Sequence, residues 1–454
     1  MKYFFSVIFS IGLLNVAIAQ DYKKVQTMVL LGKAEEAKTE VDKLSVDPKA
    51  QNKPETWYWK SKVYASIFKN EALKAKYPDI AKQADDAFKK YIEIDPALAQ
   101  VKEKGAEGFF DMYSTAFNTG LNDFKTKTWP SAAIDFETAT FYSDYIFKNK
   151  WANSTAAFDT TSILYAAYAN QNAQNMDQAA KYYSRLAEAK VTGESFQDIY
   201  KFMADYYTKK KDKAAFDRYV ALGREVYPKE NWEDYEIEYI DQNFDLAQKA
   251  AFYDQGDAAG SLSENQYLQF GDVFVNVRLK EADTSIHDQY TRKGVEAFKK
   301  AYGKNQQNAL AAYNVAVIYY NFFNEADDRY AANIRALQQL NANKPVVKDP
   351  KKKVAEDAKF KAQVDELKKA NQLVEKEATD NVDVAIDWLT KSYVILKEKA
   401  TRTSTEKNVI NKTVDFLANL YSYKMNKVRG KDPKAFDALE AKYKEFDALH
   451  SSFK

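Results

Sequence analysis

One stretch of this 454-residue chain constrains its fold more than any other: residues 200–228, which read YKFMADYYTKKKDKAAFDRYVALGREVYP. Four landmarks fall at i, i+3, i+4 and i+7, which is one stripe of a first helix: Tyr200, Met203, Ala204 and Tyr207. After a lysine-rich turn, the landmarks of a second helix are Phe216, Val220, Gly223 and the closing Pro228. The stretch therefore predicts two helices that cross closely at the small side chain of Ala204.

Counted from Tyr200, these landmarks stand at offsets 0, 3, 4, 7, 16, 20, 23 and 28. This spacing resembles that of a tetratricopeptide repeat, a helix–turn–helix unit of about 34 residues. One such hairpin cannot bury its apolar face alone, so repeats of this kind stack into a superhelix. A single match would fit an ordinary helical hairpin equally well, but related spacings recur along most of this chain.

The recurrences begin with a weak unit before Pro48 and continue in residues 57–96, 120–144, 163–186, 267–301 and 312–340, with a final pair near 414–439. Two units, 57–96 and 267–301, carry eleven extra residues between their two halves. In the first, residues 74–80 form either a longer connection or an extension of the first helix. In the second, the extra segment at residues 279–287 is polar.

The recurrences predict an all-α fold, an α-solenoid or superhelix of tetratricopeptide-like helix pairs. Two repeats carry insertions, and the C-terminal helical region is charged. The low contents of glycine (13) and proline (9) favour helices joined by short loops. The chain is expected to divide into five parts. Residues 1–19 are a leader segment, residues 20–228 a first block of repeats, and residues 229–265 a degenerate repeat or seam. Residues 266–342 are a second block of repeats, and residues 343–454 a charged linker, a long helix and a C-terminal helical pair or cap.

Two segments invite other interpretations. Residues 254–257 (DQGD) break the expected helix and suggest a calcium loop, but the alternating oxygen ligands and final glutamate of a helix–loop–helix site are missing, so a loop or seam is favoured. Residues 351–377 begin with three lysines that would suit an acidic surface. Because acidic residues alternate with the lysines, a solvated amphipathic helix is the preferred interpretation.

The N-terminus reads as a secretory signal peptide over residues 1–19. Lys2 supplies the charge, residues 4–16 the apolar core, and residues 17–19 (AIA) the cleavage site before Gln20. The apolar core is too short for a membrane anchor. The signal resembles those of Gram-negative bacteria, so the chain resembles an exported, Bacteroidetes-like tetratricopeptide-repeat protein that is periplasmic or extracellular and at most peripheral to a membrane.

Composition limits the chemistry. Lysine and arginine (67) balance aspartate and glutamate (65), which argues against nucleic-acid binding. The chain has no cysteine and two histidines, His287 and His450, and it lacks phosphate-loop, GxSxG and HExxH motifs. We therefore expect no catalytic, cofactor or metal site. The enzymatic rival is a paired-carboxylate glycosidase with tryptophan platforms at Trp57, Trp59, Trp129, Trp151, Trp232 and Trp388.

Recognition is the favoured function. In tetratricopeptide proteins the first helices line a concave face, and some members grip a peptide carboxylate with Lys and Asn one turn apart. This sequence departs from that pattern, with Lys201 and Asp205 in the central unit. The predicted partner-binding residues are Tyr58, Phe117, Lys201, Tyr313 and Tyr320, whose aromatic rings fit either a polypeptide groove or an interhelical core.

Two functions follow from these features. The first is a non-enzymatic scaffold that binds a protein or peptide in envelope or secretion assembly. The alternative is a glycan- or polymer-binding protein. With little net charge, we expect partner binding to depend weakly on salt. The sequence does not define an oligomeric state.

Overall fold

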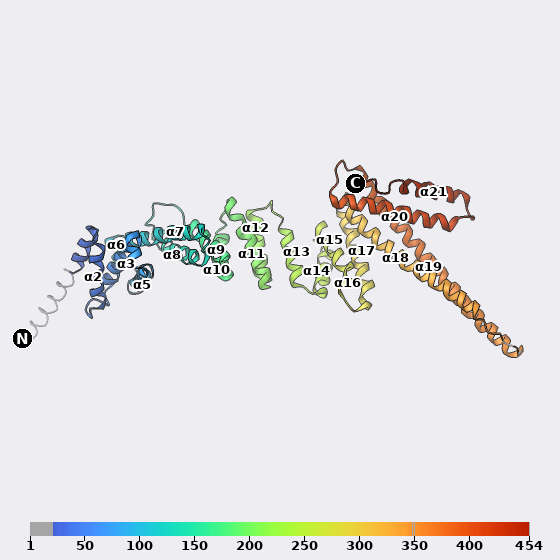
Figure 1. The fold of residues 1–454 in the computed structure, drawn as a ribbon, viewed down its shortest axis with the longest axis horizontal. Coiled ribbons are helices and arrows are strands. Elements are labelled where there is room, and N and C mark those ends of the chain that lie inside the picture. Colours follow the sequence, from blue (N-terminus) through green and yellow to red (C-terminus); the bar gives the residue numbers. More distant parts are fainter. Residues whose placement is uncertain (1–20, 347, 349, 454) are drawn as a thin grey trace, which may run out of the picture. The chain divides into compact units, whose positions relative to one another are not determined.

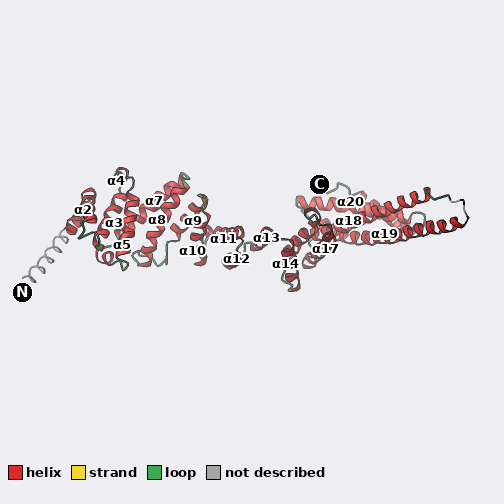
Figure 2. Cartoon of the chain, turned by 90° about the horizontal axis from the view of Figure 1, so that it is seen from below, coloured by secondary structure: helices red, strands yellow, loops and turns green. Residues whose placement is uncertain are grey.

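The computed structural model describes residues 21–346, 348 and 350–453 (Figure 1). In these residues the regular structure consists of α-helices and two short 3-10 helices, which confirms the prediction of an all-α chain (Figure 2). The predicted signal peptide, residues 1–19, lies outside this part of the chain. Within it, no helix combines the length and apolarity needed to cross a membrane. The chain divides into two compact units, unit 1 up to Asn243 and unit 2 from Phe244.

Unit 1 is a succession of helices with short connections. After a helical stretch at residues 21–30 come α2 (Ala34–Val46), α3 (Pro54–Lys69), α4 (Glu71–Lys76), α5 (Ile80–Ile94), α6 (Ala99–Lys104), α7 (Glu107–Lys125), α8 (Trp129–Lys148), α9 (Thr160–Asn172), α10 (Met176–Glu188), the 3-10 helix η1 (Glu194–Phe196), α11 (Gln197–Lys210), α12 (Lys213–Val226) and α13 (Trp232–Asn243). The central stretch of the sequence thus forms α11 and α12, as its spacing predicts.

The helices of unit 1 pack as hairpins. α3 pairs with α5, α7 with α8, α9 with α10 and α11 with α12, and each hairpin packs against the next. Ala204 on α11 is fully buried. Gly223 on α12 allows a close approach, because a Cβ there would lie 2.4 Å from the ring of Trp232. Small residues in the helix interiors thus let neighbouring helices pack tightly, the arrangement expected of tetratricopeptide-like pairs.

The extra residues of the unit at 57–96 form the short helix α4 and a turn, not an extension of α3. The Asn70 side chain caps α4 by accepting a hydrogen bond from the backbone N–H of Leu73 at 3.1 Å. The extra residues of the unit at 267–301 also form short elements, a four-residue helix and a 3-10 turn. Both insertions are therefore longer connections.

Unit 2 begins with short helices and ends with long ones. Its elements are α14 (Leu246–Ala258), α15 (Glu264–Val275), α16 (Val277–Lys280), the 3-10 helix η2 (Thr284–Ile286), α17 (His287–Lys304), α18 (Ala309–Ala342), α19 (Pro350–Glu398), α20 (Ser404–Val428) and α21 (Pro433–Asp447). α15 pairs with α17, α18 with α19, and α20 with α21.

The expected break at residues 254–257 is wrong, because α14 continues through this segment to Ala258. Gly256 lies buried inside α14, and a Cβ there would lie 2.5 Å from the side chain of Leu262. Asp257 accepts a hydrogen bond from the Tyr267 hydroxyl at 2.8 Å and forms an ion pair with Lys300. The glycine therefore allows a side chain to pack closely, and the aspartate links helices.

The division of residues 312–340 into two helices is also wrong. α18 is one helix of 34 residues, about 50 Å long, and its sequence contains no glycine or proline. Its partner is α19, a helix of 49 residues that includes the charged segment 351–377. Packing along this long hairpin keeps both helices continuous where the repeat spacing predicts a turn.

Candidate functional site

A groove of about 450 Å³ lies beside α11 in unit 1, and we call it the α11 groove. Its lining comes from α9, α10, η1, α11 and α13 and comprises Leu164, Tyr168, Gln171, Tyr183, Ser195, Asp198, Ile199, Lys201, Phe202, Asp205, Tyr235 and Glu238. On α9 these residues are spaced by three or four, and on α11 Asp198, Phe202 and Asp205 share that spacing, so one face of each helix forms a wall. The groove therefore follows from the stacking of successive hairpins.

Local hydrogen bonds fix the helices that form these walls. The carboxylate of Asp159 accepts from the backbone N–H groups of Thr161 and Ser162, at 3.0 and 3.2 Å, and so caps the start of α9. α11 ends at Lys210 and is followed by Lys211, whose backbone adopts a left-handed conformation with a φ of 58°. Asp212 then caps α12 by accepting from the N–H of Ala215 at 3.0 Å. These turns set the positions of the aromatic and charged side chains in the groove.

Aromatic rings from several helices line the groove. Tyr183 is buried, and its ring centre lies 4.7 Å from that of Phe202. The Tyr183 hydroxyl donates to Gln171 at 2.7 Å, and burial raises its pKa. Phe202 stacks on Tyr206 with ring centres 6.1 Å apart. Tyr168 is 48% exposed, so its ring offers free apolar surface beside this cluster.

Carboxylates line the same surface. The Asp198 side chain is 94% exposed, and Asp205 forms an i, i+4 ion pair with Lys209 at 2.7 Å. Lys201 pairs with Glu230 at 3.0 Å, and the hydrogen bond with Glu230 raises the pKa of Lys201. The ammonium group of Lys201 is thus already engaged by a carboxylate of its own unit.

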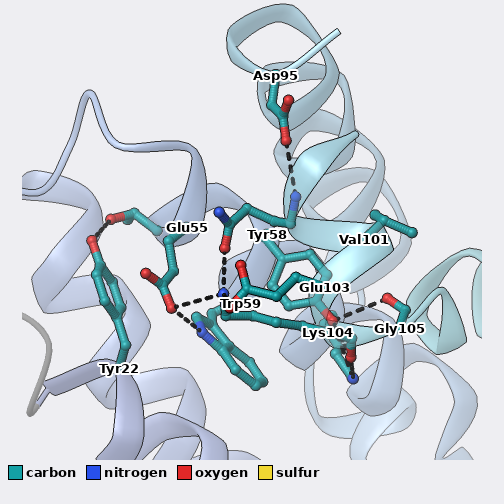
Figure 3. A network of polar contacts seen from close by, with 12 residues as sticks. Tyr22, Glu55, Tyr58, Trp59, Asp95, Val101, Glu103, Lys104 and Gly105 are labelled. Carbon is teal, nitrogen blue, oxygen red and sulfur yellow. Dashed lines mark hydrogen bonds and ion pairs between the residues drawn. The ribbon is translucent and has the colours of Figure 1, made fainter. Parts of the chain in front are cut away.

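Tyr58, predicted to face a partner, is instead a core residue. Its side chain is 3% exposed, and its hydroxyl donates to the backbone carbonyls of Lys104 and Gly105 at 2.9 and 3.0 Å (Figure 3). Burial raises its pKa. The ring packs edge-on against Trp59 and Tyr91. The C-terminal end of α6 covers this position, because the carbonyls of Lys104 and Gly105 accept the tyrosine hydroxyl.

Phe117 is half-buried between helices of unit 1. Its ring centre lies 5.5 Å from that of Phe136 on α8 and 5.8 Å from that of Tyr165 on α9. It does not line the α11 groove. Among the five predicted residues, Lys201 is the one that the structure places there.

Tyr313 and Tyr320 of unit 2 are covered by a helix of the chain itself. Their ring centres lie 6.5 and 4.3 Å from that of Phe416 on α20, and both pairs are stacked. Burial raises the pKa of Tyr313 to about 12. In unit 2 an amphipathic helix thus fills the face that was expected to bind a partner.

The tryptophans do not form exposed platforms. Trp59 and Trp232 are buried, at 3% and 2% exposure. The other four are half-buried: Trp57, Trp129, Trp151 and Trp388. Their rings contact neighbouring side chains; that of Trp388, for example, lies 5.1 Å from Tyr302.

A second groove, of about 530 Å³, lies between α17, α18 and α19 of unit 2. Ion pairs occupy much of its rim: Arg278 contacts Glu325 at 2.6 Å, and Arg329 contacts Glu377 at 2.7 Å. In the described ranges of both units, no group of three or more acidic or histidine side chains has a metal-binding arrangement. The α11 groove is the better candidate binding site because it combines the half-exposed ring of Tyr168 with the exposed carboxylate of Asp198.

Tyr168, Phe202 and Tyr235 were missed in the sequence. Lys201 was predicted because it stands where a carboxylate-binding lysine would be expected from the repeat spacing. The neighbouring position, Phe202, projects into the groove with it. The signal that was available is the recurrence of aromatic residues in α9, α11 and α13, each of which contributes one of these three rings to the groove.

Comparisons with known proteins give little further information. No family model and no curated protein matches the chain. Among solved structures, the human IFIT1 dimer with m7Gppp-AAAA is 16% identical, with 94% of this chain and 79% of that chain covered and a TM-score of 0.17. The APC/C hetero-tetramer Cut9–Hcn1 is 11% identical, with 94% of each chain covered and a TM-score of 0.17. At such scores neither likeness supports an argument about this chain, so its description rests on its own helix packing.

Proposed function

We propose that the α11 groove binds a segment of another polypeptide and that the chain is an exported, non-enzymatic scaffold for envelope or secretion assembly. The observation that carries the proposal is the groove itself, which is lined by the half-exposed ring of Tyr168, by Phe202 and by several polar side chains. Tyrosine suits polypeptide recognition because it offers a large apolar face and a hydroxyl at little conformational cost.

Unit 2 contains a tyrosine-rich helix surface that packs against another helix, which supports the proposal that such a surface can bind a polypeptide. There the aromatic stripe containing Tyr313 and Tyr320 accommodates a helix through Phe416. A first-helix surface rich in tyrosine is therefore compatible with helix packing in this chain. The α11 groove carries a similar surface without such a helix among the described residues of unit 1.

Export is inferred from the signal-like residues 1–19. The proposal places the mature chain, starting at Gln20, in the periplasm or outside the cell. N-terminal sequencing of the chain purified from a Gram-negative host tests this part. A mature N-terminus at Gln20 in the periplasmic or extracellular fraction supports it, and retention of Met1 in the cytoplasm contradicts it.

Site-specific photo-crosslinking tests the binding site. A photoreactive amino acid replaces Tyr168 in the full chain, expressed in its native envelope, and Ile134 serves as the control because it is 65% exposed on α8 outside the groove. We expect a protease-sensitive adduct from position 168 and none from 134. Equal adducts at both positions, or no adduct at position 168, would refute the proposal that the α11 groove binds a polypeptide. An adduct that resists protease but yields to glycosidases would favour the glycan alternative.

A further inference from the structure

The α11 groove carries an excess of negative charge. Among the described residues that line it, three carboxylates (Asp198, Asp205 and Glu238) face one ammonium group, that of Lys201, which leaves two negative charges. Including the ion-pair partners Glu230 and Lys209 adds one charge of each sign and does not change the excess. Because the whole chain has a formal net charge of +2, this sign is a local property of the groove.

The wall formed by α13 extends this charge. Its sequence, WEDYEIEYIDQN, contains five acidic residues and no lysine, arginine or histidine. Glu236 is paired with Arg224 at 2.9 Å, whereas Glu238 on the groove side accepts a hydrogen bond from the neutral side chain of Gln242 at 2.8 Å. A ligand in the groove thus meets carboxylates on α11 and on α13.

Two lysines at the turn between α11 and α12 form ion pairs with residues that do not line the groove. Lys210, one turn past Asp205, forms an ion pair with Asp177 at 2.8 Å. Lys213 forms an ion pair with Asp217 at 2.5 Å. Lys209 of the same lysine-rich run pairs with the groove carboxylate of Asp205, so Asp198 and Glu238 are the lining carboxylates that this run leaves without a lysine.

The aromatic rings complement these carboxylates. A lysine or arginine side chain has an apolar stem that packs on a ring and a cationic end that is attracted to the ring face and to carboxylates. Tyr168 and Phe202 supply ring surface, and Asp198 and Asp205 lie on the same helix face as Phe202. An anionic segment would lose its solvation here without a compensating partner, and a purely apolar segment would cover the carboxylates of the groove without pairing them.

We infer that the α11 groove selects a cationic polypeptide segment, with a lysine or arginine side chain placed between the Tyr168 and Phe202 rings and the carboxylates of Asp198 and Glu238. This inference rests on the proposed polypeptide binding and adds the charge of the partner. It replaces the expectation of weak salt dependence, because attraction between exposed charges is screened by salt.

Fluorescence anisotropy with defined peptides tests the inference on the full chain. The probe is a short capped peptide with alternating lysine and alanine, and the matched peptides carry arginine, Nε-acetyl-lysine or glutamate in place of lysine. We expect the lysine and arginine peptides to bind, with an affinity that falls when salt rises from about 50 to about 300 mM. Equal binding of the acetyl-lysine or glutamate peptide would overturn the inference, and this arm needs no protein variant.

Protein variants then test whether the carboxylates of the groove attract the cationic peptide. Asp198→Asn with Glu238→Gln preserves side-chain shape, and we expect it to weaken binding of the lysine peptide about tenfold, because two exposed ion pairs with the peptide are lost. The matched control is Asp86→Asn with Glu93→Gln on α5, which removes the same charge outside the groove. An equal loss in both variants would show a non-specific charge effect and overturn the inference.

Two further outcomes separate this inference from the proposed function. If the photoreactive residue at position 168 captures a polypeptide whose yield does not change in the Asp198→Asn, Glu238→Gln variant, polypeptide binding stands and cation selectivity fails. If spermidine binds the groove but the lysine peptide does not, the cation is a free polyamine and a cationic segment is excluded.

Discussion

The two units use the same kind of helical surface in opposite ways. In unit 1 the rings of Tyr168 and Phe202 line an open groove. In unit 2 the rings of Tyr313 and Tyr320 stack on Phe416 of α20 and are thereby covered. An aromatic stripe on a first helix therefore does not by itself mark a binding site, since the same stripe can belong to the core when a later helix packs on it.

Helix length accompanies this difference. The helices of the central hairpin of unit 1, α11 and α12, are 14 residues each, whereas α18 and α19 of unit 2 have 34 and 49 residues. Both long helices contact α20. Short hairpins stack side by side and leave a groove, while a long hairpin provides a surface on which another helix of the same unit can lie.

The largest expected effect concerns packing inside unit 1. Ala204→Leu should lower the free energy of unfolding of unit 1 by roughly 2–3 kcal/mol, because Ala204 is fully buried and a larger side chain overpacks the hairpin. Hydrogen exchange of the full chain should show faster exchange in α11 and α12 and unchanged exchange in α20. Lys210→Ala, which removes a surface ion pair, is the control and should change stability by less than about 1 kcal/mol. An unchanged denaturant midpoint for Ala204→Leu would contradict the close packing of this repeat.

A smaller effect should come from uncovering the aromatic stripe of unit 2. Phe416→Ala should destabilise unit 2 by about 2 kcal/mol, less than the cost for a fully buried ring because Phe416 is half-buried. Exchange should rise in α20 and stay constant in α11. Asn419→Ala, at an exposed position of the same helix, should be neutral.

The double substitution Tyr313→Ala, Tyr320→Ala sharpens this test. If the rings are core, the double variant destabilises unit 2 as Phe416→Ala does. If it leaves stability unchanged and instead lowers partner capture, the stripe of unit 2 binds a partner after all, and the contrast between the units is wrong.

The smallest effects should come from helix caps, one in each unit. Asp212 accepts from the N–H of Ala215, and Thr403 forms a reciprocal capping box with Glu406 at the start of α20. Asp212→Ala and Thr403→Ala should each cost about 1 kcal/mol. The faster hydrogen exchange should be confined to the unit that carries the substitution. Asp212→Asn should retain the stability that Asp212→Ala loses, because asparagine also caps helices. A loss spread equally over both units would show that they unfold together.

The sequence by itself determined the helical class and much of the hairpin order. Periodic apolar residues and small residues such as Ala204 are local signals, so they predicted α11 and α12 directly from spacing. The capping residues Asp159 and Asp212 act within one turn of their own position. Patterns that involve residues within a few turns of one another can be recognised in a single sequence.

The tertiary structure alone decided which aromatic rings are exposed and where long helices continue. Tyr58 is buried by carbonyls some 46 residues later in the chain, and Tyr320 by Phe416, so neither could be assigned from its own segment. α18 continues through a predicted turn because its partner α19 packs along it. Local spacing specifies which face of a helix is apolar, but burial depends on which distant helix packs there, and that choice is made by the competition among all apolar surfaces of the folded unit.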